Sequence, residues 1–186
     1  MSEGGRSADV ARRVELAAHD PGWGGEFERV AEVLRPAFGP GARVHHIGST
    51  SIEAVGVAKP VIDVLVEVGD LADAERAAGP LEAGGFEARG EYGIPGRRYF
   101  VRAAEGERPR VHVHAYRAGD PQVARHLAFR DYLRAHPHEA RAYGELKRAL
   151  AAAHPGDAAR YQDGKTEFIH AVDQRAAAWS ASRGGG

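Results

Sequence analysis

A stretch in the first half of the chain gathers side chains that could bind phosphate. Gly48 ends a short apolar run and is followed by three hydroxyl side chains, those of Ser49, Thr50 and Ser51. Glycine allows a tight turn and lets a ligand approach the backbone closely. Thr50 and Glu53 fit a capping box, so a short helix is expected here, with free N–H groups and its positive dipole end facing an anion. The turn is therefore predicted to bind phosphate.

A single carboxylate interrupts the apolar run over residues 61–68, which is too short for a helix and rich in β-branched residues. Alternation along this predicted strand places Asp63 on one face with Val61, Leu65 and Glu67, and the even-numbered apolar residues on the other. An ionised carboxylate in a central strand is costly unless it meets a metal, a cation or several donors. Asp63 is therefore predicted to be a working residue. The alternative is a structural ion pair with Lys59 or an arginine.

Two histidines, His112 and His114, alternate with valine and alanine in the predicted strand over residues 111–116. Residues two apart in a strand share a face, so both imidazoles could bind one metal ion. Imidazole together with carboxylate suits Zn, Mn or Fe better than Mg, which prefers oxygen ligands. The alternative is cross-strand packing of hydrogen-bonded imidazole rings.

Residues 46–51 (HIGSTS) and 59–63 (KPVID) resemble the GrpB-like family of the nucleotidyltransferase superfamily. Similarities in the second half of the chain, at residues 129–134 and at Tyr143, Lys147, Tyr161 and Lys165, extend the resemblance to nearly the whole sequence. Two features depart from the pattern. The superfamily's pair of acids two residues apart is absent, because Val61 and Leu65 flank Asp63, and the family's Pro-Gly after the turn is Glu53-Ala54.

The resemblance implies metal-dependent transfer of a nucleotidyl group from a nucleoside triphosphate to a small molecule. It assigns nucleotide and phosphate binding to Gly48, Ser49, Thr50, Ser51 and Lys165, and catalysis to Asp63 and Lys59. A divalent metal (Mg, Mn or Zn) is expected on Asp63, His112 and His114, one histidine taking the place of the superfamily's third acid. Because Asp63 is the one clear acid, the coordination shell of the metal needs His112, His114 or Glu67 to complete it.

Two alternative functions stay open at this stage. The first is a nucleotide- or phosphate-binding domain that keeps the turn and lacks transfer activity. The second is an enzyme that uses the same cleft on a non-nucleotide substrate, with Asp63 and the two histidines as acid and base.

Basic residues are unevenly divided, since only three of the 25 are lysines, namely Lys59, Lys147 and Lys165. Where arginine is the default cation, a lysine suggests a compact point charge, as at a phosphate oxygen. Gly164-Lys165-Thr166 does not form a P-loop, because residue 159 is alanine and no strand precedes it. Two arginine pairs, Arg97 with Arg98 and Arg130 with Arg134, are interpreted as solvated side chains more readily than as substrate clamps.

The elements that must position these residues follow from apolar periodicity. Strands are predicted at residues 14–17, 44–47, 61–68, 86–88, 98–102 and 111–116, and helices from Asp20-Pro21 to about 39, and over residues 70–83, 123–135, 138–153 and 161–181. Trp23 is interpreted as a core anchor rather than a base-stacking residue. The fold class is α/β (α+β), a mixed-sheet nucleotidyltransferase-type fold with a C-terminal helical cap. One domain is expected over residues 13–181 (sheet 13–119, cap 120–181), after a lead-in over 1–12 and before a tail over 182–186.

Composition narrows the choice of partners. The chain of 186 residues has a net charge of -1, which offers no field for nucleic acid or an anionic membrane surface. Small-molecule and nucleotide partners are therefore expected. Zero cysteines exclude thiol catalysis and thiolate metal sites, and the lack of a long apolar run favours a cytoplasmic location.

Overall fold

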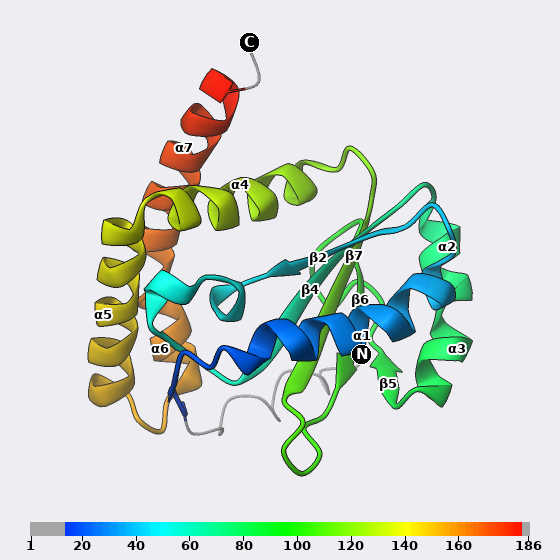
Figure 1. The fold of residues 1–186 in the computed structure, drawn as a ribbon, viewed down its shortest axis with the longest axis horizontal. Coiled ribbons are helices and arrows are strands. Elements are labelled where there is room, and N and C mark those ends of the chain that lie inside the picture. The colour runs from blue at the N-terminus through cyan, green and yellow to red at the C-terminus, as the bar shows by residue number, and fades with distance from the viewer. Residues whose placement is uncertain (1–13, 184–186) are drawn as a thin grey trace, which may run out of the picture.

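A five-stranded sheet forms the centre of the computed structural model, which describes residues 14–183 (Figure 1). Its strands lie in the order β2 (Arg43–Ile47), β4 (Val61–Val68), β7 (Arg110–Arg117), β6 (Arg98–Arg102) and β5 (Phe86–Ala88). Strands β4 and β7 are parallel, and the other neighbours are antiparallel. The predicted mixed sheet is confirmed, and β4 spans the residues predicted for it.

A second, two-stranded sheet pairs β1 (Ala17–Ala18) with β3 (Val57–Ala58). The strand predicted over residues 14–17 therefore begins later than expected. Val14 does not enter a strand ladder because its N–H donates instead to the carbonyl of Pro155, at 3.3 Å.

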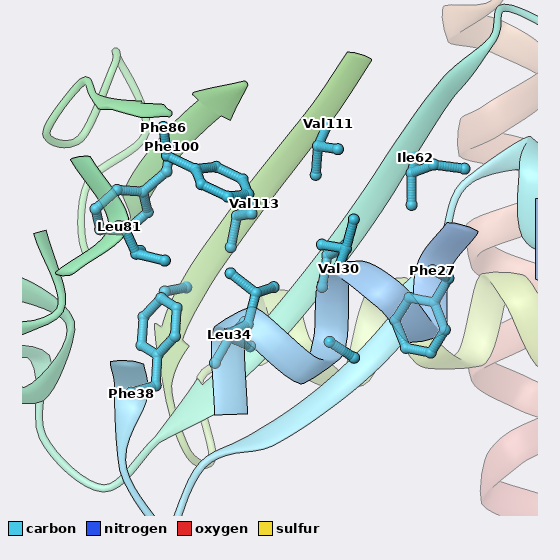
Figure 2. Close-up of a cluster of buried hydrophobic side chains, with 14 of the residues drawn as sticks. Phe27, Val30, Leu34, Phe38, Ile62, Leu81, Phe86, Phe100, Val111 and Val113 are labelled. Carbon is cyan, nitrogen blue, oxygen red and sulfur yellow. The ribbon is translucent and has the colours of Figure 1, made fainter. Parts of the chain in front are cut away.

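Three helices cover one face of the large sheet: α1 (Gly22–Phe38), α2 (Leu71–Arg76) and α3 (Ala78–Ala83). The predicted apolar stripe of α1 is buried, and Figure 2 shows Phe27, Val30, Leu34 and Phe38 packed near Ile62 and Val113 of the sheet. Trp23 is 5% exposed within the same cluster, so its interpretation as a core anchor is confirmed.

Helices α2 and α3 replace the single helix predicted over residues 70–83. Asp70 caps α2 as expected, because its side chain accepts from the N–H of Ala72 at 2.8 Å and Asp73 completes a capping box. The helix is interrupted at Ala77 because Pro80 has no N–H to donate, and its ring crowds the carbonyl four residues earlier, at Arg76.

Four further helices make up the predicted cap: α4 (Pro121–Ala135), α5 (Pro137–Ala153), α6 (Ala158–Asp163) and α7 (Thr166–Arg183). In Figure 1 they stand together on the side away from α2 and α3. Val123 and Leu127 of α4 pack on the second face of the sheet, against Leu65 and Tyr116. None of the helices within residues 14–183 is both long and apolar enough to cross a bilayer.

The helix predicted over residues 161–181 is divided into α6 and α7 at Gly164. A Cβ atom at this position would lie 2.4 Å from Cδ2 of Leu150, so any other residue here would oblige the Leu150 side chain of α5 to shift. Residues 182 and 183 are helical and do not form the predicted tail. The predicted lead-in over residues 1–12, like residues 184–186, lies outside the described residues.

Gly144→Ala should destabilise the protein, although alanine is the better helix former by about 1 kcal/mol. A Cβ atom at residue 144 would lie 1.9 Å from the carbonyl oxygen of Val55, so α5 must move away from the short 3₁₀ helix Glu53–Val55. We expect a loss of about 1–3 kcal/mol in the free energy of unfolding, measured by denaturant titration. Gly24→Ala is the matched control, because nothing lies within 4 Å of its added carbon. Equal stability changes in both variants would contradict this account.

Candidate functional site

A cavity of about 290 Å³ lies between the sheet and the helical cap, and all three lysines of the chain line it. Lys59 comes from the loop before β4, Lys147 from α5, and Lys165 from the turn before α7. Other polar side chains that line this lysine cavity are those of Ser49, Thr50, Asp63, His112, His114, Tyr143, Tyr161 and Gln162. The structure therefore brings together most of the site residues predicted from the sequence.

Asp63 and the two histidines meet on one face of the sheet, as the alternation of residues predicted. The parallel pairing of β4 with β7 sets Asp63 beside His112 and Leu65 beside His114. Nδ1 of His112 lies 3.4 Å from Oδ1 of Asp63, and Nε2 of His114 lies 3.8 Å from the same oxygen. Burial raises the pKa of Asp63, but hydrogen bonding and charge from the two imidazoles outweigh it and hold this pKa well below its usual range.

Gly48 makes room for the Asp63 carboxylate. A Cβ atom at residue 48 would lie 2.6 Å from Oδ2 of Asp63, and the backbone φ angle of +70° is one that other residues rarely adopt. The prediction that this glycine lets a ligand approach the backbone stays a prediction. In the described structure, however, the group that approaches is Asp63, and a larger residue at position 48 would displace that carboxylate.

The short helix predicted after Gly48 takes the form of 3₁₀ turns rather than an α-helix, and the predicted capping box is wrong. Residues Ser49–Ser51 and Glu53–Val55 form two single-turn 3₁₀ helices without side-chain caps. Thr50 donates its hydroxyl proton to the carbonyl of Val61 at 3.1 Å, and Ser51 donates its own to the carbonyl of Gly48 at 2.7 Å. The Thr50 hydroxyl therefore holds the turn against β4, and the Ser51 hydroxyl closes the turn on itself. A three-residue turn has no appreciable dipole to direct at an anion.

Ser51 belongs to a different part of the surface. It lines a separate hollow with Arg134, whose Nε and Nη2 donate to the Ser51 carbonyl at 3.0 and 2.8 Å. Arg130 donates to the carbonyl of His46 at 3.1 Å. The two arginines of α4 therefore stabilise the turn by donating to backbone carbonyls on either side of Gly48. They are neither substrate clamps nor simply solvated side chains.

Arg97 determines which nitrogen of His114 carries the proton. A guanidinium group only donates hydrogen bonds, and Nη1 of Arg97 lies 3.4 Å from Nδ1 of His114. Nδ1 must therefore accept, and the proton of the neutral ring is on Nε2, the nitrogen that faces Asp63. Arg97 is 6% exposed and also donates to the carbonyls of Glu91 and Tyr92, at 3.2 and 2.9 Å.

The interpretation of Arg97 and Arg98 as solvated residues was wrong for Arg97. Arg98 does pair near the surface, with Glu75 of α2 at 2.6 Å. The sequence signal that would have identified Arg97 is the alternation of residues between the two faces of a strand. Arg97 shares its parity with Tyr99, which stands opposite His114 in the sheet, whereas Arg98 shares its parity with the core residue Phe100.

His112 is oriented in the opposite sense to His114. Its Nδ1 faces the Asp63 oxygen, and two acceptors would repel each other, so Nδ1 carries the proton of the neutral ring. Its Nε2 is then the nitrogen with a free lone pair. Asp63 and His112 together have the arrangement in which a carboxylate orients a general base.

In this arrangement both imidazole nitrogens that face Asp63 carry protons, so a metal ion shared by Asp63 and the two histidines would have to displace them. Within residues 14–183, no group of three His, Cys, Asp or Glu side chains is arranged to hold a metal ion. Glu67 does not complete a shell either. Its carboxylate is bound by Arg43 at 2.7 Å and by His45 at 2.8 Å.

Two of the lysines are buried in spite of their charge. Lys147 and Lys165 are 3% and 8% exposed, and Nζ of Lys147 donates to the carbonyl of Val57 at 2.8 Å. Burial, with repulsion from Lys165 and Lys59, lowers the pKa of Lys147 to about 7. Burial, with repulsion from Lys59, lowers the pKa of Lys165 to about 8. Among residues 14–183, only the carboxylate of Asp63 lines the cavity to offset these charges.

The ring of Tyr161 lies close to two of these charges. Nζ of Lys59 and Nζ of Lys165 lie 4.8 and 4.5 Å from the centre of its ring. Burial raises the pKa of the Tyr161 phenol to about 12, so it keeps its proton. Its buried oxygen has no hydrogen-bond partner among the described residues, and a ligand oxygen would remove that cost.

Comparison with known proteins agrees with the resemblance in the sequence. The family described as GrpB protein matches residues 13–175. UPF0157 protein YqkA of Bacillus subtilis is 42% identical over 92% of this chain and 50% of its own length, so the chain spans about half of that relative. The crystal structure of conserved protein GrpB from Enterococcus faecalis has a TM-score of 0.78 and 38% identity, covering 87% of this chain and 96% of that one.

A more distant likeness is to a cytoplasmic RNA terminal U-transferase. That structure has a TM-score of 0.45 and 14% identity, covering 70% of this chain and 43% of that chain. No inference about activity is based on it.

Arg97→Met should release the single ring tautomer of His114, because methionine has no hydrogen-bond donor that obliges Nδ1 to accept. Nitrogen-15 NMR of histidine-labelled protein distinguishes protonated from unprotonated ring nitrogens. We expect protonation at Nε2 alone in the wild type and at both nitrogens in exchange in the variant. Arg98→Met is the control and should leave His114 unchanged, because Arg98 pairs with Glu75. A proton on Nδ1 of His114 in the wild type would contradict the assignment.

Proposed function

The chain belongs to the GrpB family, and we propose that it transfers a nucleotidyl group from a nucleoside triphosphate to a small-molecule acceptor. One observation carries this proposal: the three lysines of the chain converge on one cavity that contains a single carboxylate beside a suitably oriented histidine. A polyphosphate is the kind of ligand that such an excess of positive charge favours.

The phosphate chain is held mainly by the lysines rather than by the turn after Gly48. Protonated Lys59, Lys147 and Lys165 exceed the charge of Asp63 by two, and Ser49 and Tyr161 add hydroxyl groups at the cavity wall. An anion that enters restores the favourable charge state of the buried ammonium groups. A bound anion would therefore offset the free-energy cost of burying these ammonium groups.

The transfer step uses Asp63 and His112 as a pair. Nε2 of His112 accepts the proton of the acceptor's hydroxyl or amine, and Asp63 stabilises the resulting imidazolium. The acceptor atom forms a bond to the α-phosphorus as the bond from that phosphorus to the oxygen bridging to the β-phosphate breaks. Pyrophosphate leaves, and the lysines neutralise the charge that develops on it.

The divalent metal expected from the family resemblance, whether Mg, Mn or Zn, takes no part in this scheme. In this scheme Nδ1 of His112 and Nε2 of His114 keep the protons that they direct at Asp63, and a metal ion bound there would displace both. The ammonium groups supply cationic charge that metal ions provide in other phosphoryl-transfer sites.

A second candidate function is phosphate or nucleotide binding without transfer. The observation in its favour is the small number of available carboxylates. Glu67 is bound by Arg43 and His45, and within the described part of the chain Asp63 is the one carboxylate that lines the lysine cavity. This function needs the lysines but does not need His112 as a base.

Asp63→Asn should separate transfer from binding. It preserves shape and removes the charge that stabilises the His112 imidazolium, so pyrophosphate release should fall at least about 100-fold. Triphosphate affinity should be unchanged or higher, because one negative charge leaves the cavity. The assay uses the four nucleoside triphosphates, a deproteinised metabolite extract as a source of acceptors, and either Mg, Mn, Zn or a chelator. Calorimetry measures binding.

Lys165→Met is the complementary variant, because it should weaken triphosphate binding, which Asp63→Asn should not. Triphosphate affinity should fall about 10-fold with the loss of one charge-assisted contact, while stability is kept because a desolvated ammonium is removed. Arg160→Met is the control, because this side chain on the neighbouring helix is 73% exposed. It should change neither the triphosphate affinity nor the stability. Wild-type binding without pyrophosphate release in any condition would reject transfer and favour the second candidate. Undetectable triphosphate binding would reject both.

A further inference from the structure

A second and larger cavity adjoins the lysine cavity. Its volume is about 540 Å³, and it shares Lys59, Val61, His112 and Gln162 with its smaller neighbour. Because His112 lines both cavities, a molecule in the larger one lies beside the side chain proposed as the general base. We refer to this space as the acceptor cavity.

The wall of the acceptor cavity is largely apolar on two sides. Val101 and Ala104 line it from β6 and the loop that follows, and Ala158 and Ala159 line it from α6. Side chains of this kind offer contact area to a hydrocarbon body and no groups for base-specific hydrogen bonds. Polar recognition must therefore come from the other lining residues, which include Glu15, Lys59, Arg89, Tyr99, Arg110 and Gln162.

Two arginines line the acceptor cavity, and they differ in how they are engaged. Arg89 is bound to Glu87 through two hydrogen bonds, at 3.2 and 3.0 Å. Arg110 takes part in none of the ion pairs recorded within residues 14–183, and it is half-buried at the first position of β7. An unpaired guanidinium at a cavity wall is suited to a carboxylate, with which it can form two parallel hydrogen bonds.

Strand geometry relates Arg110 to His112. Residues two apart on a strand share one face and are separated by about 7 Å. In β7 these residues stand beside Val61 and Asp63 of β4, respectively. A ligand whose carboxylate is bound by Arg110 can therefore extend a hydroxyl or amine, several bonds away, toward Nε2 of His112.

We propose that the acceptor cavity binds a small organic acid with an apolar body, its carboxylate held by Arg110 and its nucleophilic hydroxyl or amine beside His112. Its identity as the acceptor rests on the proposed nucleotidyl transfer, whereas the binding of an organic acid does not. The acid loses one proton to His112 and gains the nucleotidyl group on the same atom, and the carboxylate is unchanged.

The binding test uses 3-phenylpropionate and its uncharged amide as probes on wild-type protein. Methyl NMR spectra are recorded during titration to about 10 mM, the range in which ligands of this size are expected to bind. The acid should shift the signals of Val101, Ala104 and Ala158 and should bind about 10-fold more tightly than the amide.

Arg110→Gln should remove the preference for the acid, and Arg110→Lys should retain part of it because the positive charge remains. Arg117→Gln is the control, since it lies at the far end of the same strand and is exposed. The proposal is overturned if neither probe binds, if the wild type binds both equally, if the shifts lie elsewhere, or if Arg117→Gln loses the preference as well.

The two proposals can fail separately. Lys165→Met should leave the affinity for 3-phenylpropionate unchanged, because Lys165 lines only the lysine cavity. Acid binding that persists in a protein without triphosphate binding or pyrophosphate release would reject the proposed transfer alone. Triphosphate binding without a preference for the acid over the amide would reject the acceptor cavity alone.

Discussion

Three ammonium groups that share a cavity with one carboxylate impose the main electrostatic constraint on this structure. Lys147 and Lys165 are desolvated, and their pKa values fall to about 7 and about 8, whereas the lysines of the unfolded chain keep their protons to about pH 10. The unfolded state therefore binds more protons between these values, so this contribution to stability increases as the pH rises through that window. Anion affinity should change in the opposite direction, because the protonated lysines are the ones that bind anions.

The fold brings these charges together from segments that are far apart in the sequence and that pack closely against one another. Parallel pairing of β4 with β7 sets Asp63 beside His112, and the helical cap contributes Lys147 and Lys165 from the other side. Two glycines permit the close approaches: a side chain at Gly48 would meet Asp63, and one at Gly164 would meet Leu150 of α5. A destabilised charge cluster held by a well-packed core is typical of a functional site.

Sequence patterns predicted the features that depend on local periodicity. The alternation in residues 61–68 placed Asp63 correctly on the face opposite the core, and His112 and His114 share that face. The scarcity of lysine in the sequence drew attention to three residues, and the structure brings these three lysines to one cavity. Patterns did not predict interactions over long separations. The partners of Glu67 and the contact from Arg97 to His114 depend on strand pairing, and the break at Gly164 depends on packing against α5. The capping box at Thr50 was wrong because that hydroxyl binds the carbonyl of Val61.

The most direct test of the charged cavity is NMR of protein labelled with carbon-13 at the lysine ε position, since every lysine in the chain lines the cavity. Three signals are expected, and two should titrate with pKa values of about 7 and about 8. Inorganic tripolyphosphate should raise both values, because the bound anion favours the protonated form. Titration of all three lysines near their ordinary pKa of about 10.4, with no response to tripolyphosphate, would contradict the account.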